Sequence, residues 1–369
     1  MEQFAPSPVD IIRVQEYIGQ CFRVAVAEMQ GWRSSHEDAH FMQERGACGI
    51  FGVLDGHGGK RVAKLAAEHL PNTLLASWTR GLDRDALEQA VVEGFVNTDS
   101  WLRERSSTEP EDSGATCVVA GLCDDDETGS YKGFIAHAGD SRGLFVTRSG
   151  AGGRHVWAST DHRPASAAER ARIADAGGFV TGSARKGNVA RLDGVLSVSR
   201  GFGDFAFKDP SKPSLQQKVA CVPELHMSDL QAGDLIVLAC DGVFDVLTSE
   251  ALVSRILRDE PIDAAELTAQ ILRECLGSKS FDNMTLMIIE VGAYGGDGTL
   301  RNKFYDVGVH MGLTSKPLHR AFLESACEKE DLSPEIQQIL RMASVEKSAS
   351  SLALPEQVVS GRPRRLPPL

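Results

Sequence analysis

The chain has 369 residues, enough for one large domain or two ordinary ones, and its 42% hydrophobic and 24% charged content indicates a soluble globular protein. A net charge of -12 argues against binding nucleic acid through bulk electrostatics. No apolar run approaches the roughly 20 residues that a membrane span needs. We find no secretory signal, and Glu2 stands where N-myristoylation requires glycine. We therefore expect a cytoplasmic or nuclear protein, or one in both places, with no membrane partner.

Apolar runs and helical periodicity alternate irregularly along the chain. Runs rich in Val, Ile and Phe predict strands at 22–27, 48–54, 116–122, 133–138, 144–147, 235–240 and 284–291. Apolar residues at helical spacing predict helices at 60–77, 85–103, 166–176, 249–258 and 263–276. Neighbouring strands joined by short polar turns favour antiparallel pairing, so we expect a layered α+β fold rather than a doubly wound one.

The sequence changes character towards its C-terminus. A glycine-rich run at 292–298 predicts the end of a domain that begins near residue 22, with residues 1–21 as an N-terminal extension. Residues 292–343 are expected to form a helical extension, with helices at 316–329 and 333–343. Residues 344–369, rich in Ser, Pro and Arg, are expected to be disordered.

The eight cysteines are scattered and form no Cys-x-x-Cys pair. Several, including Cys48, Cys117 and Cys240, lie in apolar strand-like runs. This pattern predicts buried thiols in a reducing compartment, and neither disulfides nor a zinc site.

Acidic residues recur at the ends of the predicted strands. The run from Phe51 ends in Asp55-Gly56-His57, and comparable acids are Glu37 with Asp38, Asp140, Asp241 and Asp282. Any one of these acids can be explained as part of a turn, because Asp-Gly often closes a hairpin. Their joint occurrence in apolar surroundings is different, because buried carboxylates are costly unless they are paired or bound to a cation.

This acid set predicts a site for hard divalent cations. Ligand sets made of oxygen atoms favour Mg²⁺ or Mn²⁺ over zinc, and one bridging carboxylate would create a two-metal centre that activates water and binds a phosphoryl group. Arg33 lies close to Glu37 in sequence and is a candidate phosphate ligand, although an isolated arginine is more often a surface residue. His57 is a candidate proton donor or, alternatively, a structural histidine that donates to a carboxylate.

The motifs, in this order, resemble those of the metal-dependent protein phosphatases, also called type 2C Ser/Thr phosphatases. The resemblance covers about residues 24–291 and rests on Gly31-Trp32-Arg33 with Glu37-Asp38-Ala39-His40, Asp55-Gly56-His57-Gly58-Gly59, Ser113-Gly114-Ala115-Thr116, Gly139-Asp140-Ser141-Arg142, Asp161-His162-Arg163-Pro164, Gly194 to Asp204, Asp241-Gly242-Val243-Phe244-Asp245 and Asp282-Asn283-Met284-Thr285. The departures from the family pattern, such as Leu54, Gly201 and Phe244, change packing and remove no predicted ligand.

The resemblance implies a β-sandwich of two antiparallel sheets with helices on both outer faces. It also implies two Mg²⁺ or Mn²⁺ ions. Asp55 would bridge them, Asp241 and Asp282 would bind the first, and Glu37 with the backbone carbonyl of Gly56 would bind the second.

Further roles follow from the same resemblance. Asp38 would orient the attacking water, Arg33 would bind the substrate phosphate, and His57 would protonate the leaving oxygen. Asp140, together with Asp241, resembles a weaker third metal site. Residues 165–190 correspond to a flap beside the active site.

Within the flap, Arg185 and Lys186 are candidates for contacts with phosphopeptides, and solvated loop charges are an equally good interpretation of this pair.

The predicted function is hydrolysis of phosphoserine and phosphothreonine in proteins, by direct in-line attack of a water activated by the two metals. No phosphoenzyme is needed. A catalytically inactive member of the family, acting as a binding module, is the alternative; it is disfavoured because every expected acid is present. A metal-dependent nuclease is disfavoured by the acidic composition and the ordered motifs.

The expected partners are phosphoprotein substrates, and we expect a monomer. The C-terminal run from Arg364 to Leu369 resembles a proline-rich ligand for SH3-type domains, and its basic residues could also serve nuclear import. A tail without a partner is the simpler interpretation.

Overall fold

The computed structural model describes residues 4–79, 81, 83–106, 112–125, 129–148, 153–182, 189–257, 263–296, 298–305 and 317–326. The chain divides into two compact units, Met1–Val309 and His310–Leu369, and the fold below is that of the first. Within the second unit, the structure describes one helix, α7 (Pro317–Ala326), which matches the helix predicted at 316–329.

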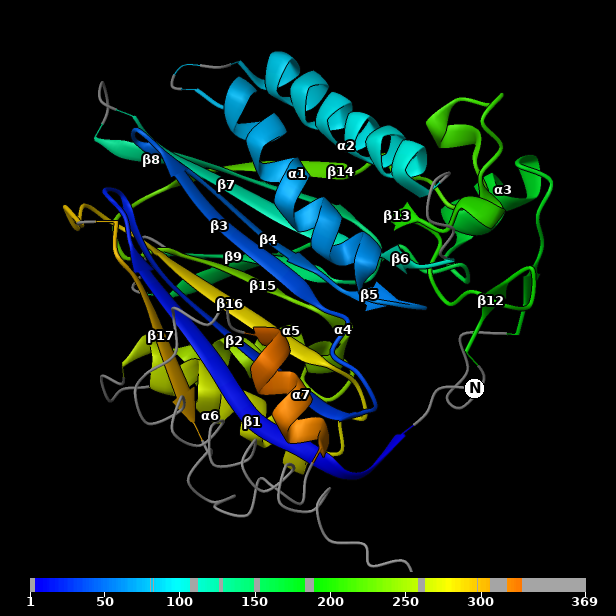
Figure 1. Ribbon diagram of the computed structural model, residues 1–369. Helices are drawn as coiled ribbons and strands as arrows, with labels where there is room; N and C mark the ends of the chain where they lie inside the picture. The colour runs from blue at the N-terminus through cyan, green and yellow to red at the C-terminus, as the bar shows by residue number, and fades with distance from the viewer. Residues whose placement is uncertain are drawn as a thin grey trace, which may run out of the picture. The chain divides into compact units, whose positions relative to one another are not determined.

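The first unit contains two large antiparallel sheets (Figure 1). The seven-stranded sheet has the spatial order β10 (Arg154–Ala158), β9 (Arg142–Arg148), β15 (Leu235–Ala239), β16 (Met284–Val291), β2 (Phe22–Arg33), β1 (Phe4–Ile18) and β17 (Leu300–Tyr305). The five-stranded sheet has the order β14 (Glu224–Leu230), β8 (Ser130–Ala138), β7 (Cys117–Asp125), β4 (Cys48–Leu54) and β3 (Ala39–Arg45).

A core of buried side chains joins the two sheets face to face. Val24 of β2 and Met287 of β16 belong to the same apolar cluster as Phe51 of β4 and Val118 of β7. All seven residues of β4 are buried, because this strand has the second sheet on one face and helices on the other. The predicted antiparallel β-sandwich is therefore confirmed.

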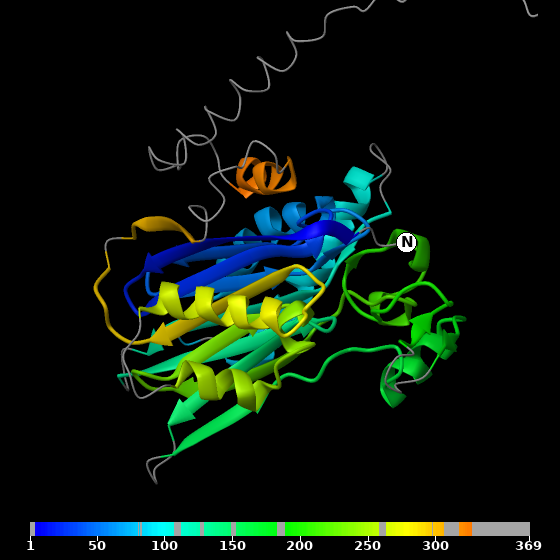
Figure 2. The ribbon, with the colours of Figure 1, turned by 90° about the horizontal axis from the view of Figure 1, so that it is seen from below.

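Helices cover the outer faces of the sandwich, as Figures 1 and 2 show from two directions. The helices α1 (Arg61–Ser77) and α2 (Arg84–Ser106) pack on the five-stranded sheet through an apolar cluster that includes Leu70 and Phe95. On the seven-stranded sheet lie α4 (Asp241–Phe244), α5 (Ser249–Ile256) and α6 (Ala264–Gly277). The side chains of Thr248 and Asp263 cap α5 and α6 by accepting hydrogen bonds from backbone N–H groups.

Short strands extend the sandwich at one end. The order β13 (Phe202–Gly203), β6 (Gly114–Ala115) and β5 (Gly56–His57) forms a three-stranded sheet directly after β4. Beside it in Figure 1 lie α3 (Ala167–Asp175) and the pair β11 (Val180–Thr181) and β12 (Arg191–Leu192). This end also carries the residues of the predicted site.

Two strands lie outside the predicted domain limits. Residues 4–18, predicted as part of an N-terminal extension, form β1 and pair with β2 along the seven-stranded sheet. Residues 300–305, predicted to lie in a helical extension, form β17 and pair with β1. The helix predicted at 333–343 and the tail at 344–369 lie outside the described residues.

The prediction that no cysteine forms a disulfide is wrong for one pair. Cys48 and Cys123 are bonded, and they lie directly opposite each other in the register of β4 and β7. This pairing depends on strand register and so leaves no local motif in the sequence. The five cysteines described as free are all buried, in agreement with the prediction for the rest.

Candidate active site

Four predicted acids come together where strands of the two sheets end. Asp55 follows β4, and Asp38 directly precedes β3. Asp241 opens α4 two residues after the end of β15, and Asp282 lies two residues before β16. Ligand atoms of Asp38, Asp55 and Cys240 lie within 4.8 Å of one another. The sandwich thus brings together carboxylates that are up to 244 positions apart in the sequence.

The carboxylates repel one another in a dry environment. Burial, and then the charge of Asp241, raises the pKa of Asp55 well above its usual range. Burial, and then the charge of Asp140, does the same to the pKa of Asp241. Burial raises the pKa of Asp38 to about 6 and that of Asp140 to about 6. The cluster therefore needs protons or cations to be stable at neutral pH.

These residues fit divalent cations. The buried Oδ1 atoms of Asp38 and Asp241 have no hydrogen-bond partner among the described residues. Burial and the nearby carboxylates raise the pKa of the Cys240 thiol well above its usual value, so the thiol stays protonated, and its Sγ accepts a hydrogen bond from Thr285 N at 3.1 Å. The remaining donors are oxygen atoms, which suit Mg²⁺ or Mn²⁺.

Glu37 and Gly56, the two further predicted ligands, are neighbours. Glu37 Oε2 accepts a hydrogen bond from Gly59 N at 3.0 Å, and Oε1 accepts one from Ser35 Oγ at 2.8 Å. A Cβ atom at Gly56 would lie 2.2 Å from the carbonyl oxygen of Glu37. Only glycine permits this approach, so the residue that follows Asp55 is fixed by the position of Glu37.

The sequence assigned no role to Asn283, yet its side chain holds the loop that carries Glu37. Asn283 Nδ2 donates to the carbonyl oxygens of Gln30 at 2.8 Å and Ser35 at 2.9 Å. Its Oδ1 accepts a hydrogen bond from Glu37 N at 2.8 Å. The one signal for this role was its place directly after Asp282 in the motif.

Arg33, the predicted phosphate ligand, lies at the acid cluster. Its Nη2 forms an ion pair with Asp282 Oδ2 at 2.5 Å. The pair fixes the guanidinium beside the candidate metal ligands. A guanidinium carries five N–H donors in a planar fork, so the same group can bind phosphoryl oxygens while it remains near Asp282.

His57 is oriented by Asp204, a partner that the sequence did not identify. His57 Nε2 lies 3.0 Å and 2.9 Å from the two carboxylate oxygens of Asp204, which is buried. Burial lowers the pKa of His57, but the charge and hydrogen bond of Asp204 outweigh it, so the pKa is raised. Gly114 leaves room for the pair, because a Cβ there would lie 2.5 Å from His57 Nε2.

The described part of the predicted flap is anchored by buried ion pairs. Glu169 of α3 binds Arg172 Nη2 at 2.7 Å and Arg200 Nη2 at 2.8 Å. Burial acts to raise the pKa of Glu169, but these two arginines outweigh burial and lower that pKa to about 2. Arg185 and Lys186 lie outside the described residues.

A second group of potential metal ligands comprises His137, His162 and Glu224. The two imidazole rings stack with centroids 4.5 Å apart and planes 16° from parallel. An ion has to lie near the plane of each imidazole that binds it, and stacked parallel rings do not share such a point. His137 Nε2 also contacts the carbonyl oxygen of Thr160 at 2.9 Å. We therefore treat this group as structural.

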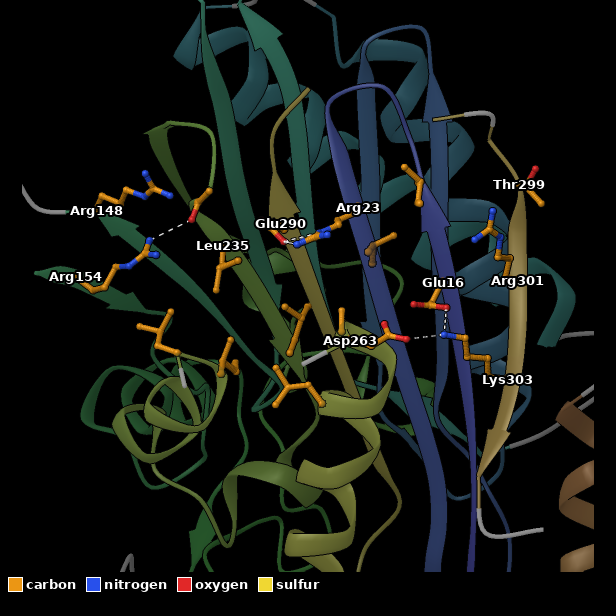
Figure 3. A pocket seen from close by; sticks show the side chains of 18 residues that line it. Glu16, Arg23, Arg148, Arg154, Leu235, Asp263, Glu290, Thr299, Arg301 and Lys303 are labelled. Atoms are coloured by element: carbon orange, nitrogen blue, oxygen red, sulfur yellow. Dashed lines mark hydrogen bonds and ion pairs between the residues drawn. The ribbon is translucent and has the colours of Figure 1, made fainter. Parts of the chain in front are cut away.

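A cavity of about 520 Å³ lies on the seven-stranded sheet, and none of the predicted site residues lines it. Figure 3 shows its lining side chains. Two of its cations are paired with neighbouring acids. Arg23 contacts Glu290, and Lys303 Nζ lies 2.6 Å from Glu16 Oε2 and 2.9 Å from Asp263 Oδ2. The lining contains none of the motif residues and no cluster of mutually repelling carboxylates, so we place the reaction centre at the carboxylate cluster and not in this cavity.

Comparisons with known proteins identify relatives of this chain. The family model "Protein phosphatase 2C" matches residues 22–284. "Protein phosphatase 2C homolog 2" of Aspergillus flavus is 33% identical over 317 residues, which cover 78% of this chain and 68% of that protein. "Probable protein phosphatase 1N" of Mus musculus is 37% identical over 279 residues, which cover 72% of this chain and 64% of that protein.

Solved structures share the fold. A phosphatase from Toxoplasma gondii superposes with a TM-score of 0.68 at 22% identity, over 80% of this chain and 100% of that one. A sex determining protein of C. elegans superposes with a TM-score of 0.61 at 26% identity, over 74% of this chain and 65% of that one. With a family model that covers most of the sequence, and a site built from the motifs of that family, the chain belongs to the protein phosphatase 2C family.

Proposed function

We propose that this chain is a metal-dependent protein serine/threonine phosphatase that uses Mg²⁺ or Mn²⁺. The observation that supports the proposal most strongly is the cluster of buried, mutually repelling carboxylates, two of which have unpartnered oxygen atoms, beside the guanidinium of Arg33. Phosphate esters are anions, so a site for them needs positive charge, and this acid cluster supplies it only when cations are bound.

The residues divide into two ligand sets around Asp55. Asp55 would be shared by both ions, with Asp241 and Asp282 completing one set. Glu37 and the carbonyl oxygen of Gly56 would complete the other set. When bound, the ions would lower the pKa of a water molecule and neutralise charge on the phosphoryl group.

Two further acids support these sets. Asp140 would hold a weaker third ion together with Asp241. Asp38 is fixed by the hydroxyl of Thr285, which donates to its Oδ2 at 2.6 Å. Its other oxygen is left to orient the attacking water.

Arg33 would bind two phosphoryl oxygens through its planar fork of donors and so align the ester for in-line attack. His57 would give its proton to the oxygen of the departing serine or threonine. Since Nε2 is engaged by Asp204, Nδ1 is the ring nitrogen left for that transfer. Asp204 would act on the reaction through His57, by keeping the imidazole oriented and protonated.

The test is hydrolysis of a phosphoserine peptide and of p-nitrophenyl phosphate, with and without Mn²⁺, by the wild type, Asp55→Asn and Asp241→Asn. Both variants should lose at least 100-fold in kcat, about the loss seen when one electrostatic group of an active site is removed. Circular dichroism should show that they remain folded. Asp229→Asn, an exposed acid that pairs with Lys132, is the matched control and should retain full activity.

Near-normal turnover of either variant at saturating Mn²⁺ would contradict the two-metal assignment. A folded wild type that binds phosphopeptides but hydrolyses none of them at any Mn²⁺ concentration would favour the alternative, a binding module that has lost catalysis.

A further inference from the structure

Three aromatic side chains meet beside the candidate active site. The ring centroids of Phe4 and Phe281 are 6.0 Å apart, and those of Trp32 and Phe281 are 6.1 Å apart. Phe4 is 55% exposed and Phe281 is 51% exposed. We call these three residues the aromatic platform.

Each member of the platform is tied by the backbone to the ion pair of Arg33 and Asp282. Trp32 precedes Arg33, Phe281 precedes Asp282, and Phe4 is the register partner of Arg33 in the pairing of β1 with β2. The three platform residues therefore come from three separate segments of the chain, which meet at the proposed phosphate ligand. Single exposed apolar side chains are ordinary, but here two exposed rings and the half-buried Trp32 are joined through Phe281 next to the proposed reaction centre, which points to an interaction site.

The strand register places Phe4 beside the phosphate ligand. Residues directly opposite each other in an antiparallel pair have Cα atoms about 5 Å apart, and Phe4 and Arg33 form such a pair beyond a register shift in β1. An extended peptide advances about 3.4 Å per residue. A substrate whose phosphate is held by Arg33 would thus bring a residue one or two positions away over the platform.

We propose that the aromatic platform is a substrate subsite for an apolar or aromatic side chain one or two residues from the phosphorylated serine or threonine. The subsite rests on the proposed phosphatase function and narrows its substrates to phosphoproteins with such a neighbour. Exposed aromatic rings bind apolar side chains through area burial and ring stacking, without requiring a charge on the substrate.

The size of the platform favours a peptide over a second copy of the chain. Three partly exposed rings offer about 300 Å² of apolar surface, whereas a stable protein interface buries about 800 Å² on each partner. One or two substrate side chains are enough to cover that area. The platform is also continuous with the carboxylate cluster, where the rest of a substrate would lie.

The experiment compares two phosphoserine peptides that differ only in having Phe or Ser next to the phosphorylated residue, placed in turn at one and two positions on either side. The wild type should prefer a Phe peptide by about tenfold in kcat/KM, at the low end for an added apolar group in a pocket. Phe4→Ser and, separately, Phe281→Ser should reduce that ratio towards one. Both variants should keep the wild-type kcat/KM for p-nitrophenyl phosphate, which has no flanking residue.

Leu300→Ser is the matched control. Leu300 is an exposed apolar residue, 45% exposed, and its register partner is Tyr17, at the opposite end of β1 from Phe4. This variant should keep the full preference. Phe281 adjoins a proposed metal ligand, so Phe281→Ser could slow the hydrolysis of every substrate. In that case Phe4→Ser is the variant that decides.

Equal rates for the paired peptides in an active wild type would overturn the subsite and leave the phosphatase function intact. A preference that survives Phe4→Ser unchanged would also overturn it. If the wild type hydrolyses neither the peptides nor p-nitrophenyl phosphate, the phosphatase function fails and the subsite with it.

Discussion

Replacing Asp38 by asparagine should stabilise the metal-free protein. Asp38 is 4% exposed, and burial raises the pKa of its carboxyl group from 3.8 to about 6. The native state therefore holds this proton to a higher pH than the unfolded state. Consequently the free energy of unfolding falls as pH rises from about 4 to above 6, and it does not recover at higher pH.

The pKa shift sets the size of the effect. A difference of about 2 pKa units, at about 1.4 kcal/mol per unit, lowers the free energy of unfolding at pH 8 by at most about 3 kcal/mol. Asparagine carries no charge, and its side-chain oxygen can still accept the hydrogen bond that Thr285 donates to Asp38. Asp38→Asn should therefore gain up to about 3 kcal/mol at pH 8 and only about 1 kcal/mol at pH 4.5.

Urea unfolding at the two pH values, in EDTA, measures this difference. Asp229→Asn is the control, because its side chain is 72% exposed and its replacement should change stability by less than about 0.5 kcal/mol. Saturating Mn²⁺ should narrow the gap, since bound cations would neutralise Asp38 in the wild type. A variant that is less stable than wild type at pH 8, or equally shifted at both pH values, would refute the reasoning.

Three further substitutions test individual parts of the site. Arg33→Ala should lower kcat/KM for p-nitrophenyl phosphate by about 100-fold or more, because a charged phosphate ligand is lost; a loss under fivefold would contradict its role. Asp204→Asn should lower kcat about tenfold and move the descending limb of the pH–rate profile to lower pH, since Asp204 raises the pKa of His57; an unmoved limb would exclude the pairing. Gly56→Ala should lower the free energy of unfolding by about 1–3 kcal/mol and weaken Mn²⁺ binding in calorimetry, because the new Cβ would lie 2.2 Å from the carbonyl oxygen of Glu37. Gly277→Ala is the control and should be tolerated, because a Cβ there would have no atom within 4 Å.

Much of the sandwich could be predicted from the sequence. The strand predicted at 284–291 coincides with β16, and the one at 48–54 with β4, because buried strands appear as short runs of Val, Ile and Phe. Neither β1 nor β17, nor their pairing, was predicted from the sequence. Their partner residues, such as Tyr17 and Leu300, are far apart in the chain, and no local turn joins the two strands.

The acids could be predicted because each lies next to an apolar strand and within a family motif. Their supporting partners could not, because these contacts arise only when distant segments meet. Asp204 lies 147 positions from His57, and Cys123 lies 75 positions from Cys48. The platform residue Phe281 adjoins a predicted ligand, but only the tertiary structure brings it to Phe4.

None of the helices among the described residues is long and apolar enough to cross a membrane.

The central claim is that the carboxylates around Asp55 hold divalent cations. Crystals of the wild type grown with Mn²⁺, and measured at the manganese absorption edge, test it directly by anomalous scattering. We predict two strong peaks that share Asp55, one beside Asp241 and Asp282 and the other beside Glu37. The absence of peaks at Asp55, or peaks only at His137 and His162, would contradict the assignment.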